Sequence, residues 1–159
     1  MEREWYQRQT WTKADQADFR TRLSRARSEN RPQYLRLQAA TLLASGDQYL
    51  SPAIALLDEV IEGHPQSLEV ATAFGEKGAG LRRLGNIVGA ANAYAASVAR
   101  MRAVPKMQYQ DGWLDYGLLV ATERLSQRYT DALEVLAEFS ALSPLMLRVD
   151  WFRVMRAEP

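Results

Sequence analysis

The chain contains AIALLDEVIEGHP at residues 53–65 and ALEVLAEFSALSP at residues 132–144, two stretches with the same spacing. In each, a leucine follows the first alanine by four positions and a proline follows the leucine by eight. Ala90, Tyr94 and Pro105 form a looser third copy between them. Self-similarity at a period of roughly 40 residues is typical of helical repeats, in which each unit buries its apolar face by stacking on its neighbours. The sequence therefore predicts an all-α repeat fold, an architecture suited to binding.

Composition limits the classes of function. The 159 residues suit a single domain, and 20 Lys and Arg against 19 Asp and Glu leave no global field that would gather nucleic acid or anionic membrane. The chain has no cysteine, which excludes disulfides, thiolate metal sites and thiol nucleophiles. Residues 2–4 are charged where a signal peptide is apolar, and no run of about 18 apolar residues occurs. We therefore expect a soluble cytoplasmic protein without a membrane segment.

Sparse glycine and proline separate the apolar-periodic segments, so we expect about eight helices joined by short loops. The aromatic residues 5, 6 and 11 lie in a segment without periodicity, which we interpret as an arm that packs on the body. A first helix over 13–29 begins at a capping box formed by Thr12 and Asp15. A last helix is expected over 145–156. The helices between them are expected to begin near Pro32, Ser51, Ser67, Ile87, Trp113 and Thr130.

Three of these segments carry the clearest buried stripes, because their apolar residues recur at steps of three or four. The stripes consist of Ala53, Ile54, Leu57, Val60 and Ile61 in the third helix, of Ile87, Ala90, Ala91, Tyr94, Val98 and Met101 in the fifth, and of Ala132, Leu133, Leu136 and Phe139 in the seventh.

The middle unit resembles a tetratricopeptide repeat, in which pairs of helices of about 34 residues stack into a right-handed superhelix. Only Lys77 departs from the pattern, where an apolar residue is usual. The matching residues of this unit are Phe74, Gly78, Leu81, Gly85, Asn86, Ala90 and Tyr94. The neighbouring units offer Leu37, Ala40, Thr41, Ala53, Leu57 and Pro65, and Tyr116, Leu119, Val120, Ala132, Leu136 and Pro144.

The resemblance implies an all-α, right-handed α-α superhelix with extra N- and C-terminal helices, in one domain over 1–159. The expected divisions are an arm over 1–11, a first helix over 12–31, repeats over 34–66, 67–105 and 106–144, and a closing helix over 145–157. Another right-handed helical-repeat family or an irregular bundle remains an alternative, because the repeated alanines are 37 and then 42 residues apart (90 − 53 and 132 − 90).

No enzyme signature emerges, and we expect no cofactor and no metal. Gly75 and Gly80 match the outer glycines of a phosphate-binding loop, but Leu81 stands where that loop needs its lysine, and close helix approach explains the glycines better. His64, the only histidine, lies in a Gly-His-Pro helix stop. One histidine cannot form a histidine cluster for zinc. The carboxylates opposite the apolar stripes are interpreted as solvated faces.

The resemblance also implies a concave groove lined by the first helix of each unit, where an extended peptide or a helix of a protein partner would bind. It places there Leu35, Gln38 and Leu42, then Thr72, Gly75, Glu76, Ala79, Arg82 and Arg83, and finally Leu114, Gly117, Leu118, Ala121 and Arg124. Chaperone-binding members of the family hold a carboxylate with lysine and asparagine. Gln38, Leu42, Glu76, Leu114 and Leu118 replace them here, so we expect no such clamp. Packing of the arm or the last helix in the groove is an equally open alternative.

The leading hypothesis is a non-catalytic protein-interaction module, such as a small bacterial adaptor, escort or neutralising (immunity-type) protein, acting as a monomer or as a weak homodimer through a terminal helix. The alternative is nucleic-acid binding by the arginine-rich first helix, on which Arg20, Arg27 and Arg31 would align. Local pairing of these arginines is favoured over a phosphate-contacting patch, because such rows usually lie over the core.

Overall fold

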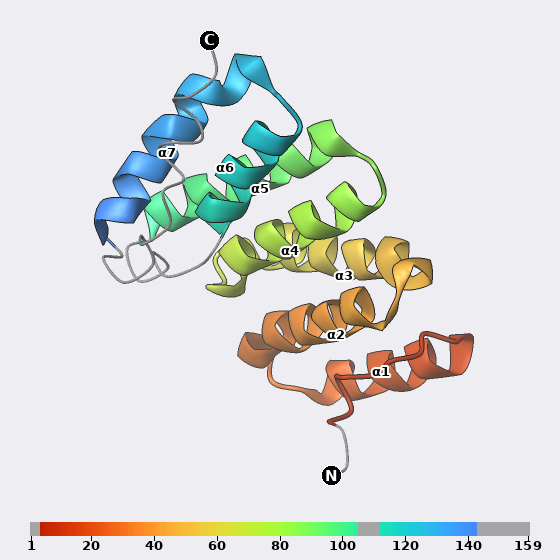
Figure 1. The fold of residues 1–159 in the computed structure, drawn as a ribbon. Coiled ribbons are helices and arrows are strands. Elements are labelled where there is room, and N and C mark those ends of the chain that lie inside the picture. The colour runs from red at the N-terminus through yellow and green to blue at the C-terminus, as the bar shows by residue number, and fades with distance from the viewer. Residues whose placement is uncertain (1–3, 105–111, 143–159) are drawn as a thin grey trace.

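The computed structural model describes residues 4–104 and 112–142, and within these ranges every regular element is helical. Seven α-helices follow one another (Figure 1): α1 Lys13–Arg25, α2 Arg31–Ser45, α3 Leu50–Gly63, α4 Glu69–Arg83, α5 Ile87–Ala103, α6 Gly112–Thr122 and α7 Tyr129–Leu142. Short 3-10 turns precede α2, α3 and α7, at Ser28–Asn30, Asp47–Tyr49 and Ser126–Arg128. The expected closing helix over 145–156 lies outside the described residues, and so do Pro105 and Pro144.

The helices are arranged in chain order, from α1 at one end of the molecule to α7 at the other (Figure 1). From α2 onward each helix packs against the next, and α4 also contacts both α2 and α6. Contacts are therefore made mainly between neighbours along the chain, as expected when each unit covers the apolar face of the adjacent one.

Helix α4 belongs to both hydrophobic cores of the described chain. Its Val70 and Ala73 lie in a core with residues of α1, α2 and α3, whereas its Ala71 lies in a second core with residues of α5, α6 and α7. Because α4 is covered on two sides, it carries small residues on its contact surfaces. The buried residues of this helix are Val70, Ala71, Ala73, Gly78 and Gly80.

The three repeated alanines face the interior, as predicted: Ala53 and Ala90 are 0% exposed and Ala132 is 1% exposed. In the seventh helix, however, Leu133 was expected to face inward and is 40% exposed. The inward positions there are Ala132, Val135 and Phe139, which recur at steps of three and four and leave Leu133 on the other side of the helix.

The glycines of α4 permit close helix contacts, which confirms the structural interpretation of this cluster. A Cβ added to Gly78 would lie 2.8 Å from ring carbons of Tyr94 on α5. One added to Gly80 would lie 3.1 Å from Ile54 on α3 and 3.2 Å from Leu43 on α2. All of these glycines are inside a helix, so they do not form the loop that would be needed to surround a phosphate.

Capping residues explain where α1 and α5 begin. The Thr12 hydroxyl accepts from the Asp15 backbone N–H, and the Asp15 carboxylate accepts from the Thr12 N–H, so the predicted capping box is confirmed. At α5 the Asn86 side chain accepts from the N–H of Gly89, and Gly85 before it has φ 78°, a conformation that favours glycine.

Two helices are shorter than predicted. Helix α1 ends at Arg25 instead of residue 29, because Ala26 adopts an extended conformation with φ −71° and ψ 151°. Helix α6 ends at Thr122 instead of residue 127, and Arg124 in the following turn has φ 52°. No glycine or proline marks either of these helix ends, so the sequence pattern did not predict them. Among the described helices, none is both long and apolar enough to cross a lipid bilayer.

Candidate partner-binding face

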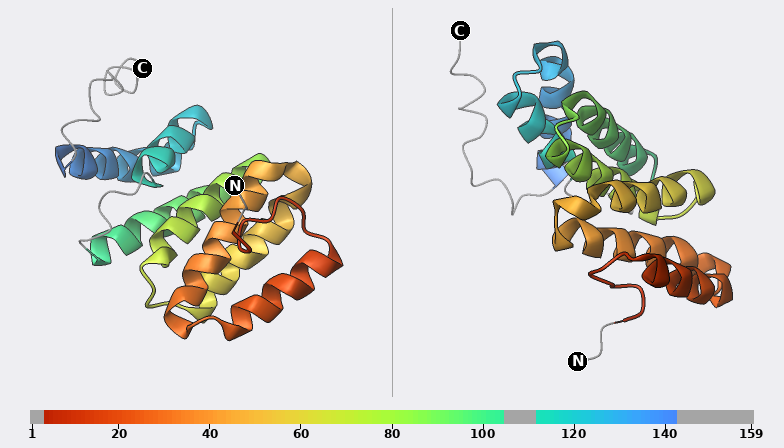
Figure 2. Two further views of the ribbon diagram at one scale, coloured as in Figure 1. Left: turned by 90° about the horizontal axis from the view of Figure 1, so that it is seen from below. Right: turned by 90° about the vertical axis from the view of Figure 1, so that its right-hand side faces the viewer.

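The first part of the predicted groove is occupied by the chain itself. Gln38 and Leu42 of α2 are each 0% exposed, so neither side chain can contact a partner in this conformation. The amide oxygen of Gln38 accepts from the backbone N–H of Arg8 at 2.9 Å, and its amide nitrogen donates to the Arg8 carbonyl at 2.7 Å. Arm residues 4–11 therefore lie against α1 and α2, as Figure 2 shows.

Aromatic side chains hold the arm at this place. Tyr6 stacks on Tyr34 of α2 with ring centroids 4.7 Å apart, and Trp5 lies 5.0 Å from the same ring. Trp5 and Trp11 also contact Phe19 of α1, at 5.5 and 5.4 Å. The sequence predicted an arm that packs on the body, and these contacts confirm it.

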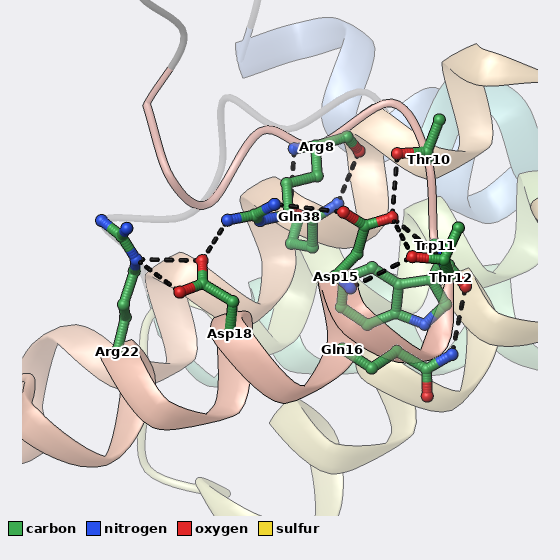
Figure 3. A network of polar contacts seen from close by, with 9 residues as sticks. All are labelled: Arg8, Thr10, Trp11, Thr12, Asp15, Gln16, Asp18, Arg22 and Gln38. Carbon is green, nitrogen blue, oxygen red and sulfur yellow. Dashed lines mark hydrogen bonds and ion pairs between the residues drawn. The ribbon is translucent and has the colours of Figure 1, made fainter.

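The Arg8 side chain reaches α1, where its guanidinium pairs with Asp15 at 3.1 Å and with Asp18 (Figure 3). The other oxygen of Asp15 accepts from Thr10 and Thr12. These hydrogen bonds, led by that from the Thr12 backbone N–H, lower the pKa of Asp15 to about 2. Asp15 therefore caps α1 and anchors the arm with one carboxylate.

The predicted groove residue Glu76 is engaged in the contact between α2 and α4. Arg36 of α2 donates to Glu69 and, at 2.7 Å, to Oε1 of Glu76. The second oxygen of Glu76 is buried and accepts no hydrogen bond. Burial raises the pKa of Glu76, and the nearby Arg36 opposes that rise. This carboxylate is therefore engaged in the packing of α2 against α4.

Arg83 also has a structural role, although the resemblance placed it among the groove residues. Its guanidinium donates to the Leu43 carbonyl and to Asp47, each at 2.5 Å. Since Asp47 lies in the turn between α2 and α3, Arg83 fastens the end of α4 to the preceding helix pair.

Helices α4 and α6 leave the remaining predicted residues partly exposed. Ala79 and Arg82 on α4, with Leu114, Leu118 and Ala121 on α6, form what we call the open face. Arg82 makes no ion pair within residues 4–104 and 112–142. Charge interactions with Asp115 and Arg82 reach the hydroxyl of Tyr94, whose pKa is raised to about 12, chiefly by burial. Because Asp115 belongs to α6, both α6 and Arg82 of α4 lie near the Tyr94 hydroxyl.

In the third unit, Gly117 of α6 makes the close helix contact that Gly78 makes in the second. A Cβ added to Gly117 would lie 2.8 Å from the methyl carbons of Leu136, the same relationship that joins Gly78 to Tyr94. Gly117 is therefore the counterpart of Gly78 in this contact, although it was not among the residues matched to the repeat pattern. Gly117 is buried in this contact and does not face the groove, whereas Leu114 and Leu118 stay on the open face. Arg124 is exposed in the turn after α6.

The predicted arginine row of the first helix does not form. Helix α1 ends before Arg27 and Arg31, so neither can align with Arg20. Arg20 pairs with Glu59 of α3 at 2.7 Å, and Arg31 donates to the carbonyls of Ser24 and Ala26 at the end of α1. Of the three, only Arg27 is exposed and without an ion pair in the described part of the chain.

His64 performs the helix-ending role expected of it. Its backbone N–H donates to Val60 at the end of α3, and its side chain borders a shallow hollow of about 600 Å³ between the start of α2 and the turn before α4. No group of three or more His, Asp or Glu side chains that could hold a metal ion occurs within the described ranges.

No protein-family model matches the sequence, and no curated protein or solved structure is detectably similar to it. The tetratricopeptide resemblance stays a prediction that rests on the residues quoted for it.

The clamp formed by Gln38, Asp15 and Asp18 around Arg8 was not predicted from the sequence. One signal was present, because Gln38 is a polar residue among the apolar positions of α2 and a buried amide needs partners. The identity of those partners depended on the path of the arm, which has no periodicity.

Proposed function

We propose that this protein is a non-catalytic interaction module that binds a segment of a partner protein along the open face of α4 and α6. The stack of helix pairs is proposed to continue as a right-handed, tetratricopeptide-like superhelix. The described helices support this proposal because they pack in chain order and because α4 touches the equivalent helices on both sides.

The observation that carries the proposal is the contrast between α2 and the two later helices. In the predicted groove of α2, Gln38 is bound by the arm and Leu35 and Leu42 are buried in the core, whereas Ala79, Leu114 and Leu118 are only partly buried. Small and apolar side chains accept an apolar segment of a peptide or helix. Arg82, without an ion pair in the described residues, offers a guanidinium fork to a partner carboxylate.

This chemistry suits a partner segment that presents apolar side chains next to an aspartate, a glutamate or a terminal carboxylate. It fits the role of an adaptor, an escort or a neutralising protein that acts by occupying another molecule. We do not propose a reaction, since the residues of the open face include no nucleophile, acid or base positioned for one.

Affinity capture from the native host tests this proposal. Reversal of Arg82 and Arg124 to glutamate should abolish recovery of the partner, because like charges would then face its carboxylate, while the helicity and the melting temperature stay unchanged. Arg27→Glu is the control, because Arg27 is an exposed arginine without an ion pair in the described residues and lies outside the open face, just after α1. Equal recovery by the reversed and control proteins would count against the open face.

The same control addresses nucleic acid. A gel shift that weakens with Arg27→Glu and falls steeply with salt would favour the alternative function. We expect neither effect, because Arg20 and Arg31 are already engaged within the protein.

A further inference from the structure

The amide of Gln38 binds main-chain atoms only. Both of its hydrogen bonds go to the backbone of Arg8, one to the N–H and one to the carbonyl. A residue inside a helix uses these two groups for the helix itself, so this clamp can hold only a non-helical segment. Because it does not touch the side chain of the clamped residue, it accepts any residue except proline.

The side chains around the clamp select particular chemistry. Asp15 and Asp18 receive the guanidinium of Arg8, and Tyr34 and Phe19 receive aromatic rings. These four residues and Gln38 are the walls of what we call the arm site. Carboxylates that accept a guanidinium give directional, charge-assisted hydrogen bonds.

The walls of the arm site are anchored without the arm. Phe19 and Leu23 are buried on one side of α1, and Arg20 forms an exposed ion pair with Glu59 of α3. Arg31 holds the end of α1 through two backbone carbonyls. Helix α1 therefore has contacts of its own with the rest of the protein, besides those that it makes with residues 4–11.

Apart from the buried Gln38, the arm is held largely by contacts that solvent can reach in part. The side chains of Arg8 and Asp18 are 27% and 40% exposed, and exposed ion pairs contribute only about 0–1 kcal/mol each. The aromatic residues Trp5, Tyr6 and Trp11 are also only partly buried. The arm has the advantage of being tethered, which gives it a high effective concentration at its site.

We propose that the arm is an internal competitor and that the arm site also binds a segment of the partner protein. The partner segment would share the chemistry of the arm: two aromatic residues, then an arginine two positions after the second, in a non-helical conformation. The inference rests on the proposed function, because Gln38 lies on α2, which contacts α4 and so extends the open face. Partner binding would displace residues 4–11.

A peptide with the sequence of residues 4–12, labelled with a fluorophore, tests this inference by anisotropy. The receptor is the full chain with Trp5→Ala and Arg8→Ala, which weakens the internal arm and leaves the walls intact. We expect this receptor to bind the peptide roughly tenfold or more tightly than the wild-type protein does, since the tethered competitor is lost. Adding Gln38→Leu should abolish binding, and adding Arg27→Ala should leave it unchanged.

Two results would overturn the inference: no binding to the weakened-arm receptor while its circular dichroism and cooperative melting remain native, or binding that ignores Gln38→Leu. If the receptor does not fold, hydrogen exchange on the wild-type protein decides, because excess peptide should deprotect the backbone N–H of Arg8. If the peptide leaves the protection of the Arg8 N–H unchanged, the arm is not displaced and the inference is rejected. The contrary result by light scattering would be a dimer in which each copy places its arm in the arm site of the other. The site would then bind a second copy of this chain and not a partner protein, which contradicts the proposal.

The outcome is independent of the capture experiment. If the peptide fails to bind but capture still depends on Arg82 and Arg124, only the arm inference is lost. If the peptide binds as expected but capture ignores both arginines, the open face is lost and the arm site remains.

Discussion

The ring of Tyr94 lies directly on Gly78, so close that a Cβ on Gly78 would be 2.8 Å from two of the ring carbons. Leu136 lies on Gly117 in the same way, also at 2.8 Å. Tyr94 and Leu136 are the bulky members of the repeated alanine pattern. Each therefore covers a glycine on the preceding helix, which explains in physical terms why the bulky residue follows the buried alanine by one helical turn.

This contact predicts that Gly78→Ala destabilises the protein. Overpacking against Tyr94 should cost about 1–3 kcal/mol, offset in part by the better helix propensity of alanine, about 1 kcal/mol. Gly75→Ala is the matched control on the same helix, because its Cβ would lie at an ordinary 3.7 Å from the Ser97 hydroxyl. Urea unfolding should show a loss for the first variant and no loss for the second. Equal effects would mean that Tyr94 does not determine the packing.

Asp15 should make the docking of α1 and the arm dependent on pH. Its pKa is lowered from 3.8 to about 2 in the folded protein, so its contribution to stability is complete above pH 3.8 and disappears as the pH falls through 2. Asp15→Asn should lower stability near neutral pH by about 0.3–1 kcal/mol, because the amide keeps an acceptor oxygen but loses the negative charge at the start of α1. The difference between variant and wild type should shrink toward pH 2 in thermal melts. A constant difference would show that the carboxylate charge is not involved.

Tyr94 should respond at the other end of the pH scale. Its pKa is raised from 10.0 to about 12, so the folded protein keeps the phenol protonated where the unfolded chain has lost the proton. Stability should therefore fall as the pH rises from 10 toward 12. Tyr94→Phe should remove this part of the loss of stability at alkaline pH. In an absorbance titration of the tyrosines, it should also remove the phenolate that forms at the highest pH. An unchanged titration would place the hydroxyl in water.

Arg36 and Glu76 should be strongly coupled. Arg36→Met leaves a mostly buried Glu76 carboxylate, one oxygen of which already accepts no hydrogen bond, without its guanidinium partner. An uncompensated polar group of this kind costs about 1–3 kcal/mol, more if charged. The double variant Arg36→Met with Glu76→Leu should regain much of that loss, because the unpaired buried carboxylate of Glu76 is gone and only Glu69, which is partly exposed, has lost its partner. Additive effects in a double-mutant cycle would contradict this coupling.

The helices were predictable from the sequence because their signals are local. The apolar steps of α3 and α5, the capping box at Thr12 and the turn at Gly85 each depend on a few adjacent residues. The burial of Ala53, Ala90 and Ala132 followed from the same periodicity. The end of α1 at Arg25 was not predictable in this way, since no glycine or proline marks it.

The candidate site was predictable only where it depends on one helix face. Leu114 and Leu118 stay partly exposed on α6. Gly117 proved to be a contact point for Leu136, since the spacing between the two helices of the third unit differs from that in the second. Gln38 and Arg83 were misplaced for another reason. Their partners, Arg8 and Asp47, come from the arm and from a turn, whose positions no periodicity fixes.

The central claim, that the open face binds a partner protein, is tested most directly by a photo-crosslinking amino acid placed in the full chain within the native host. Leu118 on α6 is the test position, and the exposed Ala99 on α5 is the control. We expect a crosslink to one specific protein from position 118, lost with Arg82→Glu, and none to that protein from position 99. The same crosslink from both positions, or from 99 alone, would contradict it.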